Sequence, residues 1–132
     1  MTTWTSDELD TIGTAEDLRL ATRRPDGTLR TPVTIWVVRH RDDLYVRSWR
    51  GPGGSWFRHA RKRRDGHIQA GEIDKDVTFA HAGHELDDQI DAAYRAKYHR
   101  YPSYVGPMIS PQARATTIKL VPRMAGDRKS VV

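Results

Sequence analysis

Residues 47–56 read Arg-Ser-Trp-Arg-Gly-Pro-Gly-Gly-Ser-Trp, a glycine-rich stretch between an alternating apolar segment and a basic run. In the segment before it, Leu44 and Val46 alternate with other side chains, as in a half-buried strand. Glycine and proline then break that strand, and Ser55 is a typical N-cap for a helix that carries Trp56. The stretch therefore predicts a strand, a loop and a helix start in direct succession.

This loop has the composition of an anion site. Glycines let the backbone approach a ligand closely, and the unpaired N–H groups at a helix start favour a phosphate. Arg47 and Arg50 would add bidentate charged donors, and Trp49 or Trp56 would offer a flat surface to an aromatic ring. A purely structural turn with core tryptophans is the alternative, and the residues alone leave both open.

The positive charge of the chain is concentrated in the same region. The 132 residues include 22 Lys and Arg against 17 Asp and Glu, for a net charge of +5. Residues 47–64 hold seven of the cations and no acid. We expect an anionic partner there, which could be a phosphorylated cofactor, a nucleic acid or a membrane surface. A solvated helix face is the simpler alternative.

The sequence on both sides of this stretch also predicts strands and helices. The expected strands are 18–21, 33–38, 44–49, 67–70, 76–82 and 116–121, with hairpin turns at Asp26-Gly27, 41–43 and 71–75. The expected helices run from Ser6 to about Gly13, from Ser55 onward, and from Asp87 to about Arg100, where Pro102 ends the last one. Because closure removes exposed edges, six short strands with inserted helices predict an α+β fold built on a small antiparallel barrel. We expect one domain, residues 1–124, and a flexible tail, residues 125–132.

Several classes of protein are disfavoured. The chain has no cysteine, so a disulfide framework, a thiolate metal site and a cysteine nucleophile are absent. Its first residues are acidic rather than signal-like, and no apolar run approaches the roughly 20 residues of a membrane span. His81 and His84 fit surface positions better than a metal site, and no serine-hydrolase, Walker or dinucleotide motif occurs. We therefore expect a soluble cytoplasmic protein without a metal or a membrane partner.

The order of these elements resembles the split β-barrel flavin and deazaflavin reductases. The likeness runs from about Leu18 to Pro122 and is greatest to the deazaflavin-dependent nitroreductase branch, although this chain fits a side family of that superfamily. Only the loop and the following helix are specific in sequence. The resemblance implies a split-barrel fold that often forms homodimers, with coenzyme F-420 or FMN as cofactor.

The same resemblance implies a set of ligand contacts. The positions that match the segment binding the cofactor's phosphate and polar tail are Ser48, Arg50, Gly51, Gly54, Ser55 and Trp56. We expect the phosphate on Arg50, Gly53, Gly54 and Ser55, with the ring near Trp36 and Trp49. Position 59 departs from the pattern, because His59 stands where an asparagine is common in the relatives.

Three tyrosines, Tyr98, Tyr101 and Tyr104, recur at intervals of three residues. The nitroreductase branch carries similarly placed tyrosines over the reactive face of its cofactor. A reduced cofactor supplies the hydride in such enzymes, so a tyrosine need only orient the substrate or donate a proton. Packing within a helix and turn is the alternative for all three.

The combined prediction is a reductase that passes hydride from reduced F-420 or FMN to a small organic acceptor. Two other functions stay open: a carrier that binds the cofactor without catalysis, and a small barrel that binds nucleic acid through the basic run and its tryptophans. Nucleic acid is disfavoured, because the basic stripe does not extend over more of the barrel.

Overall fold

The computed structural model describes residues 3–123. Its strands are β1 (Leu18–Thr22), β2 (Val33–Ile35), β3 (Val38–His40), β4 (Asp43–Val46), β5 (Asp65–Ala70), β6 (Ile73–His81) and β7 (Ile118–Pro122). Its α-helices are α1 (Ser6–Thr14), α2 (Ser55–Lys62), α3 (Asp87–Lys97), α4 (Pro102–Met108) and α5 (Pro111–Arg114), and a 3-10 turn, η1 (Gly51–Gly53), precedes α2. The tail expected at residues 125–132 lies outside the described residues.

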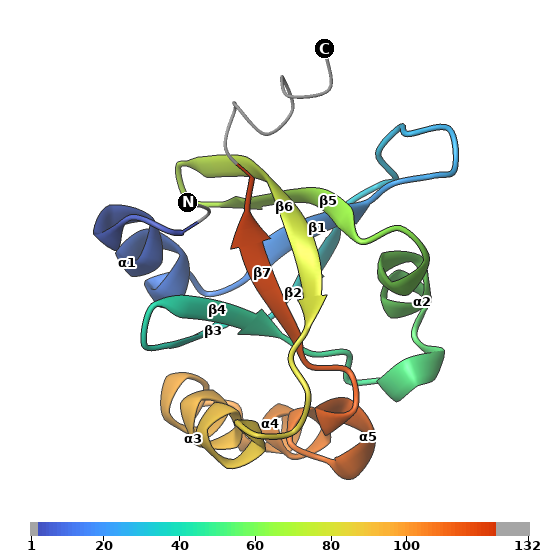
Figure 1. Ribbon diagram of the computed structural model, residues 1–132. Helices are drawn as coiled ribbons and strands as arrows, with labels where there is room; N and C mark the ends of the chain where they lie inside the picture. Colours follow the sequence, from blue (N-terminus) through green and yellow to red (C-terminus); the bar gives the residue numbers. More distant parts are fainter. Residues whose placement is uncertain (1–2, 124–132) are drawn as a thin grey trace.

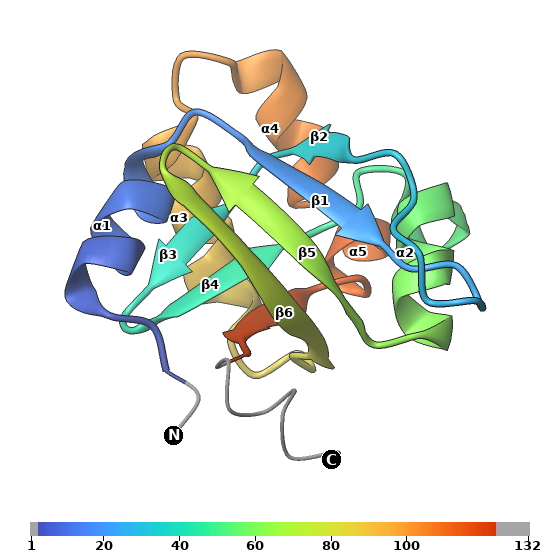
Figure 2. The same cartoon turned by 90° about the horizontal axis from the view of Figure 1, so that it is seen from above.

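All seven strands form one curled antiparallel sheet in the order β2-β1-β5-β6-β7-β4-β3 (Figures 1 and 2). The two edge strands, β2 and β3, follow each other directly in the sequence, so the chain itself connects the two ends of the sheet. Helices α3, α4 and α5 gather at one end of the barrel, and α2 lies apart from them at its side (Figure 1). The α+β class is confirmed.

The strand count of six was wrong, because the segment expected as one strand from Val33 to Val38 is two. Side chains of the helical end take the backbone groups that a continuous strand would pair at Val37. The Val37 N–H donates to the Tyr98 hydroxyl at 3.2 Å, and the Val37 carbonyl accepts from Lys97 Nζ at 2.6 Å. One predicted strand therefore serves both edges of the sheet as β2 and β3.

Other boundaries also moved. The β5–β6 hairpin turns at Gly71 and Glu72, so β6 begins at Ile73 rather than near Asp76. Helix α3 ends at Lys97, and the sequence signals missed α4 and α5 altogether. Both short helices begin with a proline, which suits a first helical position but also imitates a break in the sequence.

Two apolar clusters hold these elements together. The larger one fills the barrel under α1 and α2, and it includes Leu18, Leu44, Phe57, Phe79 and Leu120. The smaller one joins β3 and β4 to α3 and α4 through a set that includes Val38, Tyr45, Ile90, Tyr94 and Tyr98. Within residues 3–123, no helix is both long enough and apolar enough to span a bilayer.

Candidate functional site

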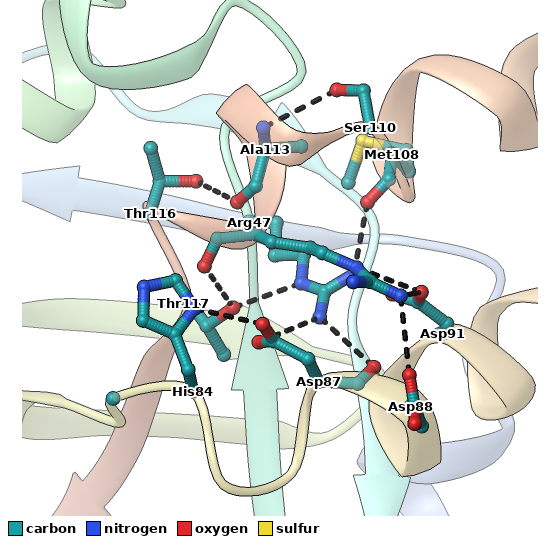
Figure 3. A network of polar contacts seen from close by, with 12 residues as sticks. Arg47, His84, Asp87, Asp88, Asp91, Met108, Ser110, Ala113, Thr116 and Thr117 are labelled. Atoms are coloured by element: carbon teal, nitrogen blue, oxygen red, sulfur yellow. Dashed lines mark hydrogen bonds and ion pairs between the residues drawn. The ribbon is translucent and has the colours of Figure 1, made fainter.

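Arg47, which follows β4 directly, lies in the interior and anchors the helical end of the barrel (Figure 3). Its Nη1 donates to Asp91 Oδ1 at 2.5 Å and to the Met108 carbonyl at 3.1 Å, and its Nε donates to Thr117 Oγ1 at 2.9 Å. Asp87 adds a carboxylate at 3.7 Å from Nη2. The guanidinium thus ties β4 to α3, to the end of α4 and to the segment before β7.

The second carboxylate oxygen of Asp91 binds another arginine, Arg114 of α5. Hydrogen bonds to this carboxylate are the largest cause that raises the pKa of Arg114, so Arg114 stays charged. A buried arginine with these partners offers no donors to a ligand. We therefore assign Arg47 a role in positioning the loop rather than in contacting a cofactor.

The glycine-rich loop leaves the barrel immediately after this anchor. The backbone N–H of Ser48 donates to Thr116 Oγ1 at 2.8 Å, and the Gly51 N–H returns to the Ser48 carbonyl at 2.9 Å. Gly51 has a φ of +73°, which favours glycine, and a Cβ on Gly54 would lie 2.5 Å from Ser48 Oγ. These two glycines are required by the fold of the loop.

The rest of the loop faces solvent. Arg50, Gly53 and Ser55 are exposed, and the Arg50 guanidinium lies over the Trp49 ring, with 4.9 Å between the Arg50 Cζ and the ring centroid. Among residues 3–123, no side chain caps the start of α2, where Gly54 is the N-cap residue. Free N–H groups, a cation and an exposed aromatic ring therefore occur together here, as an anionic ligand with a ring would need.

Trp36 and the tyrosines form a separate cluster at the helical end of the barrel, where they pack with residues of α3 and α4 (Figure 1). Trp36 stacks on Tyr98 with 3.8 Å between ring centroids, and it lies 6.0 Å from Tyr101. The Tyr98 hydroxyl is bound to the Val37 backbone and to the Glu16 carbonyl, and the Tyr101 hydroxyl donates to Glu16 Oε1 at 2.8 Å. Desolvation by burial raises the pKa of Tyr98.

The structure does not bring the three tyrosines to one surface. Tyr98 is buried, Tyr101 is half-buried, and Tyr104 on α4 is 68% exposed. Tyr98 belongs to the core, and the catalytic role expected of Tyr101 and Tyr104 stays a prediction. Trp56 is half-buried against the larger apolar cluster, whereas Trp49 is 56% exposed.

His59 lies on the face of α2 that looks toward the β1–β2 hairpin. Partial desolvation and the cations Arg30, Arg58 and Lys62 lower its pKa. Arg30 belongs to the β1–β2 hairpin and Arg58 and Lys62 belong to α2, so cations of both elements act on this imidazole. The basic surface expected from the sequence is therefore formed by α2 together with the hairpin, not by α2 alone.

The opposite face of α2 borders a cavity of about 540 Å³, within the range typical of small-molecule sites. Its walls come from η1 and α2 on one side and from β6, β7 and the end of α5 on the other. The lining residues are Pro52, Phe57, Ala60, Arg61, Arg64, Phe79, His81, Ala115 and Ile118. Apolar walls and cationic groups thus meet in one space.

Among these lining residues, only Pro52 belongs to the glycine-rich stretch at residues 47–56. Phe57, Ala60, Arg61 and Arg64 recur at three- and four-residue spacing, which a helical face would have predicted. Phe79, His81 and Ile118 carry no comparable signal, because only strand pairing between β6 and β7 brings them to the cavity. Sequence reasoning located the loop and missed the cavity beside it.

The sequence matches a protein family model over residues 8–120, described as an uncharacterized protein conserved in bacteria (DUF2255). The chain belongs to this family. A comparison with curated proteins found no match.

Solved structures of other proteins have a fold similar to that of this chain. A protein of unknown function from Agrobacterium tumefaciens superposes with a TM-score of 0.63 at 12% identity, over 86% of this chain and 50% of that one, so this chain spans about half of its length. The heme storage protein of Vibrio cholerae gives 0.62 at 14% identity, over 88% and 87% of the two chains. An FAD-binding protein from Mesorhizobium loti gives 0.54 at 18% identity, over 91% and 89%. The split-barrel resemblance is confirmed as a likeness of fold.

Proposed function

We propose that this protein binds a phosphorylated flavin or deazaflavin, FMN or coenzyme F-420, and supports hydride transfer to a small organic acceptor. One observation carries the proposal: the cavity and the glycine-rich loop adjoin. Pro52 of the loop and Phe57 of α2 line the same space. A ligand whose phosphate sits at the loop can therefore place its ring between apolar walls.

The residues present fit such a group. The uncapped start of α2, with the exposed Gly53 and Ser55, would hold the phosphate, and Arg50 would add a charged donor. Phe57 and Phe79 offer apolar walls to a planar ring. When bound in its reduced form, the cofactor supplies the hydride. The chain's own part is to bind, to orient and to exclude water from the buried end of the cavity.

Titration of the purified protein with FMN and with F-420, each in both redox states, tests the binding step by fluorescence and absorbance. We expect saturable binding of one cofactor. Arg50→Ala should weaken it by about 1.5–3 kcal/mol through loss of a charged hydrogen bond. Arg95→Ala, which removes an exposed arginine from α3, is the matched control and should leave the affinity unchanged. Failure of both cofactors to bind would reject the proposal.

A carrier without catalysis is the second candidate, and the tyrosine cluster favours it. The hydroxyls of Tyr98 and Tyr101 are both bound within the protein, so neither is free to act on a substrate in this arrangement. Turnover with the reduced cofactor and an artificial acceptor separates the candidates: reoxidation that depends on the protein supports a reductase, and binding without turnover supports a carrier. The homodimer stays a proposal, which light scattering would test against the 15.1 kDa chain.

A further inference from the structure

The cavity beside α2 has a polar corner that the cofactor phosphate does not require. Arg61 lies in the last turn of α2, Arg64 lies between α2 and β5, and His81 ends β6. From Ser55 to Lys62 helix α2 rises by about 10 Å, and Arg64 lies two residues beyond its end, so this corner is separated from the loop by the length of α2. Any second anionic group in the site would have to be recognised here.

Both arginines at this corner lack a carboxylate partner within residues 3–123. The neighbouring Arg63 is different, because its Nε donates to Asp65 Oδ1 at 3.0 Å. The Arg61 guanidinium lies over the ring of Phe57, with its Cζ 5.8 Å from the ring centroid. Two unneutralised guanidinium groups at the wall of a cavity complement an oxyanion, and each can form a bidentate pair with it.

His81 supplies a ring N–H donor beside them. The backbone N–H of Gly83 donates to His81 Nδ1 at 3.2 Å, and Gly83 makes the return turn with a φ of +72°. Because Nδ1 accepts that bond, the ring proton of the neutral imidazole is on Nε2. The charged groups near this turn are Arg61 of α2, Arg64 of the segment between α2 and β5, and Glu85, whose Oε2 would lie 3.0 Å from a Cβ on Gly83.

We propose that Arg61, Arg64 and His81 form an oxyanion subsite that selects an anionic acceptor with a flat apolar body, such as an aromatic carboxylate. The apolar part packs against Ala115 and Ile118, beside the cofactor ring held between Phe57 and Phe79, and the carboxylate accepts hydrogen bonds from the two guanidinium groups and from His81 Nε2. This inference rests on the proposed function, because it names the acceptor class of the same site. The subsite would make the protein prefer a negatively charged acceptor, a preference that cofactor binding alone does not create.

The test compares 4-nitrobenzoate with 4-nitrobenzamide, which have nearly the same shape but differ in charge. Binding is followed by NMR of the arginine side chains and the histidine rings, without and with saturating cofactor. We expect 4-nitrobenzoate to bind at least about tenfold more tightly, with shifts at Arg61, Arg64 and His81. The double variant Arg61→Gln/Arg64→Gln should lose this preference, and Arg95→Gln should keep it. Circular dichroism confirms that the exposed substitutions leave the fold intact.

Two variants test the role of His81 as a donor. His81→Ala should weaken 4-nitrobenzoate binding, and His81→Gln should restore part of it because the amide keeps an N–H donor. In the free protein, the ¹⁵N shifts of His81 should show an unprotonated Nδ1. Equal affinity for the two probes, or a preference that survives the double arginine substitution, would overturn the inference.

The two failures are distinguishable. If 4-nitrobenzoate binds through Arg61 and Arg64 but neither cofactor binds, the proposed function fails and an anion subsite remains. If a cofactor binds and the probe does not, or the probe displaces the cofactor in competition, the corner does not select the acceptor and the inference fails.

Discussion

At the scale of single residues, Arg47 shows how a charge in the interior organises a site that it does not enter. Its donors go to Asp91, Thr117 and the Met108 carbonyl, so three separate segments are held against the end of β4. These contacts of Arg47 therefore set the direction in which the loop leaves the barrel at Ser48. A buried pair of this kind need not add net stability, but the loss of one partner leaves an uncompensated charge.

Asp91→Asn should therefore destabilise the protein strongly. Removal of the buried carboxylate leaves Arg47 without its closest counterion, and we expect a loss of about 3–5 kcal/mol in the free energy of unfolding. Asp88→Asn, on the same helix, is the control. Its side chain is 93% exposed, so a change within about 0.5 kcal/mol is expected. Urea unfolding of the two variants measures the difference, and similar values for both would contradict the role of Asp91.

At the scale of elements, the pairing of β5 with β1 requires a glycine at position 66. A Cβ on Gly66 would lie 2.3 Å from the Ala21 carbonyl oxygen and 2.7 Å from Phe79 Cζ. Gly66→Ala should cost at least about 2 kcal/mol, since the main chain of β1 must shift. Gly106→Ala on α4 is the matched control, because its added Cβ meets nothing within 4 Å. It should be neutral or stabilising by up to about 1 kcal/mol, and thermal unfolding that ranks the two variants the other way would refute the packing argument.

The β5–β6 hairpin carries a pH-dependent contact at His67. Burial of the ring alone would lower its pKa, but hydrogen bonds to Asp76 and Asp74 outweigh that cost and raise it. A raised folded-state pKa means that the stabilisation is complete below the pKa of the unfolded chain. It is then lost as the pH rises through the folded pKa.

We therefore expect the difference in unfolding free energy between the native protein and His67→Gln to be larger at about pH 6 than at about pH 9. Urea unfolding at both values measures it. The effect should be small, because Asp74 is 65% exposed and solvent screens its charge. A difference that grows toward alkaline pH would show that the sign is wrong.

At the scale of the whole molecule, the net charge of +5 and the basic surface of α2 and the hairpin keep the nucleic-acid alternative testable. Contact with four phosphates of a single strand would give a slope of about −3 in a plot of log affinity against log salt concentration. One cofactor phosphate gives a much shallower slope. We expect a shallow slope for the cofactor and only weak oligonucleotide binding at physiological salt. A steep slope with tight oligonucleotide binding would favour the nucleic-acid function instead.

The α+β class, the strand–loop–helix succession around residues 47–64 and the basic character of that region could all be predicted from the amino-acid sequence. These features depend on local rules: alternation along a strand, glycine at a tight turn and a local excess of arginine. Most strands were predicted for the same reason, and so was the start of α3 at Asp87. The predicted cap at Ser55 was wrong, because Ser55 is the first residue of α2 and Gly54 is its N-cap residue.

Which of these residues can contact a ligand depends on the folded arrangement of the chain. Arg47 and Arg50 are three positions apart and look alike in the sequence, yet one is buried against Asp91 and the other is exposed over Trp49. The split of one strand into β2 and β3 depends on Tyr98 and Lys97, about 60 residues away in the chain. The cavity likewise needs β6 and β7 to pair before Phe79, His81 and Ile118 face α2. Contacts between distant parts of a chain depend on its whole packing, so no local pattern of residues encodes them.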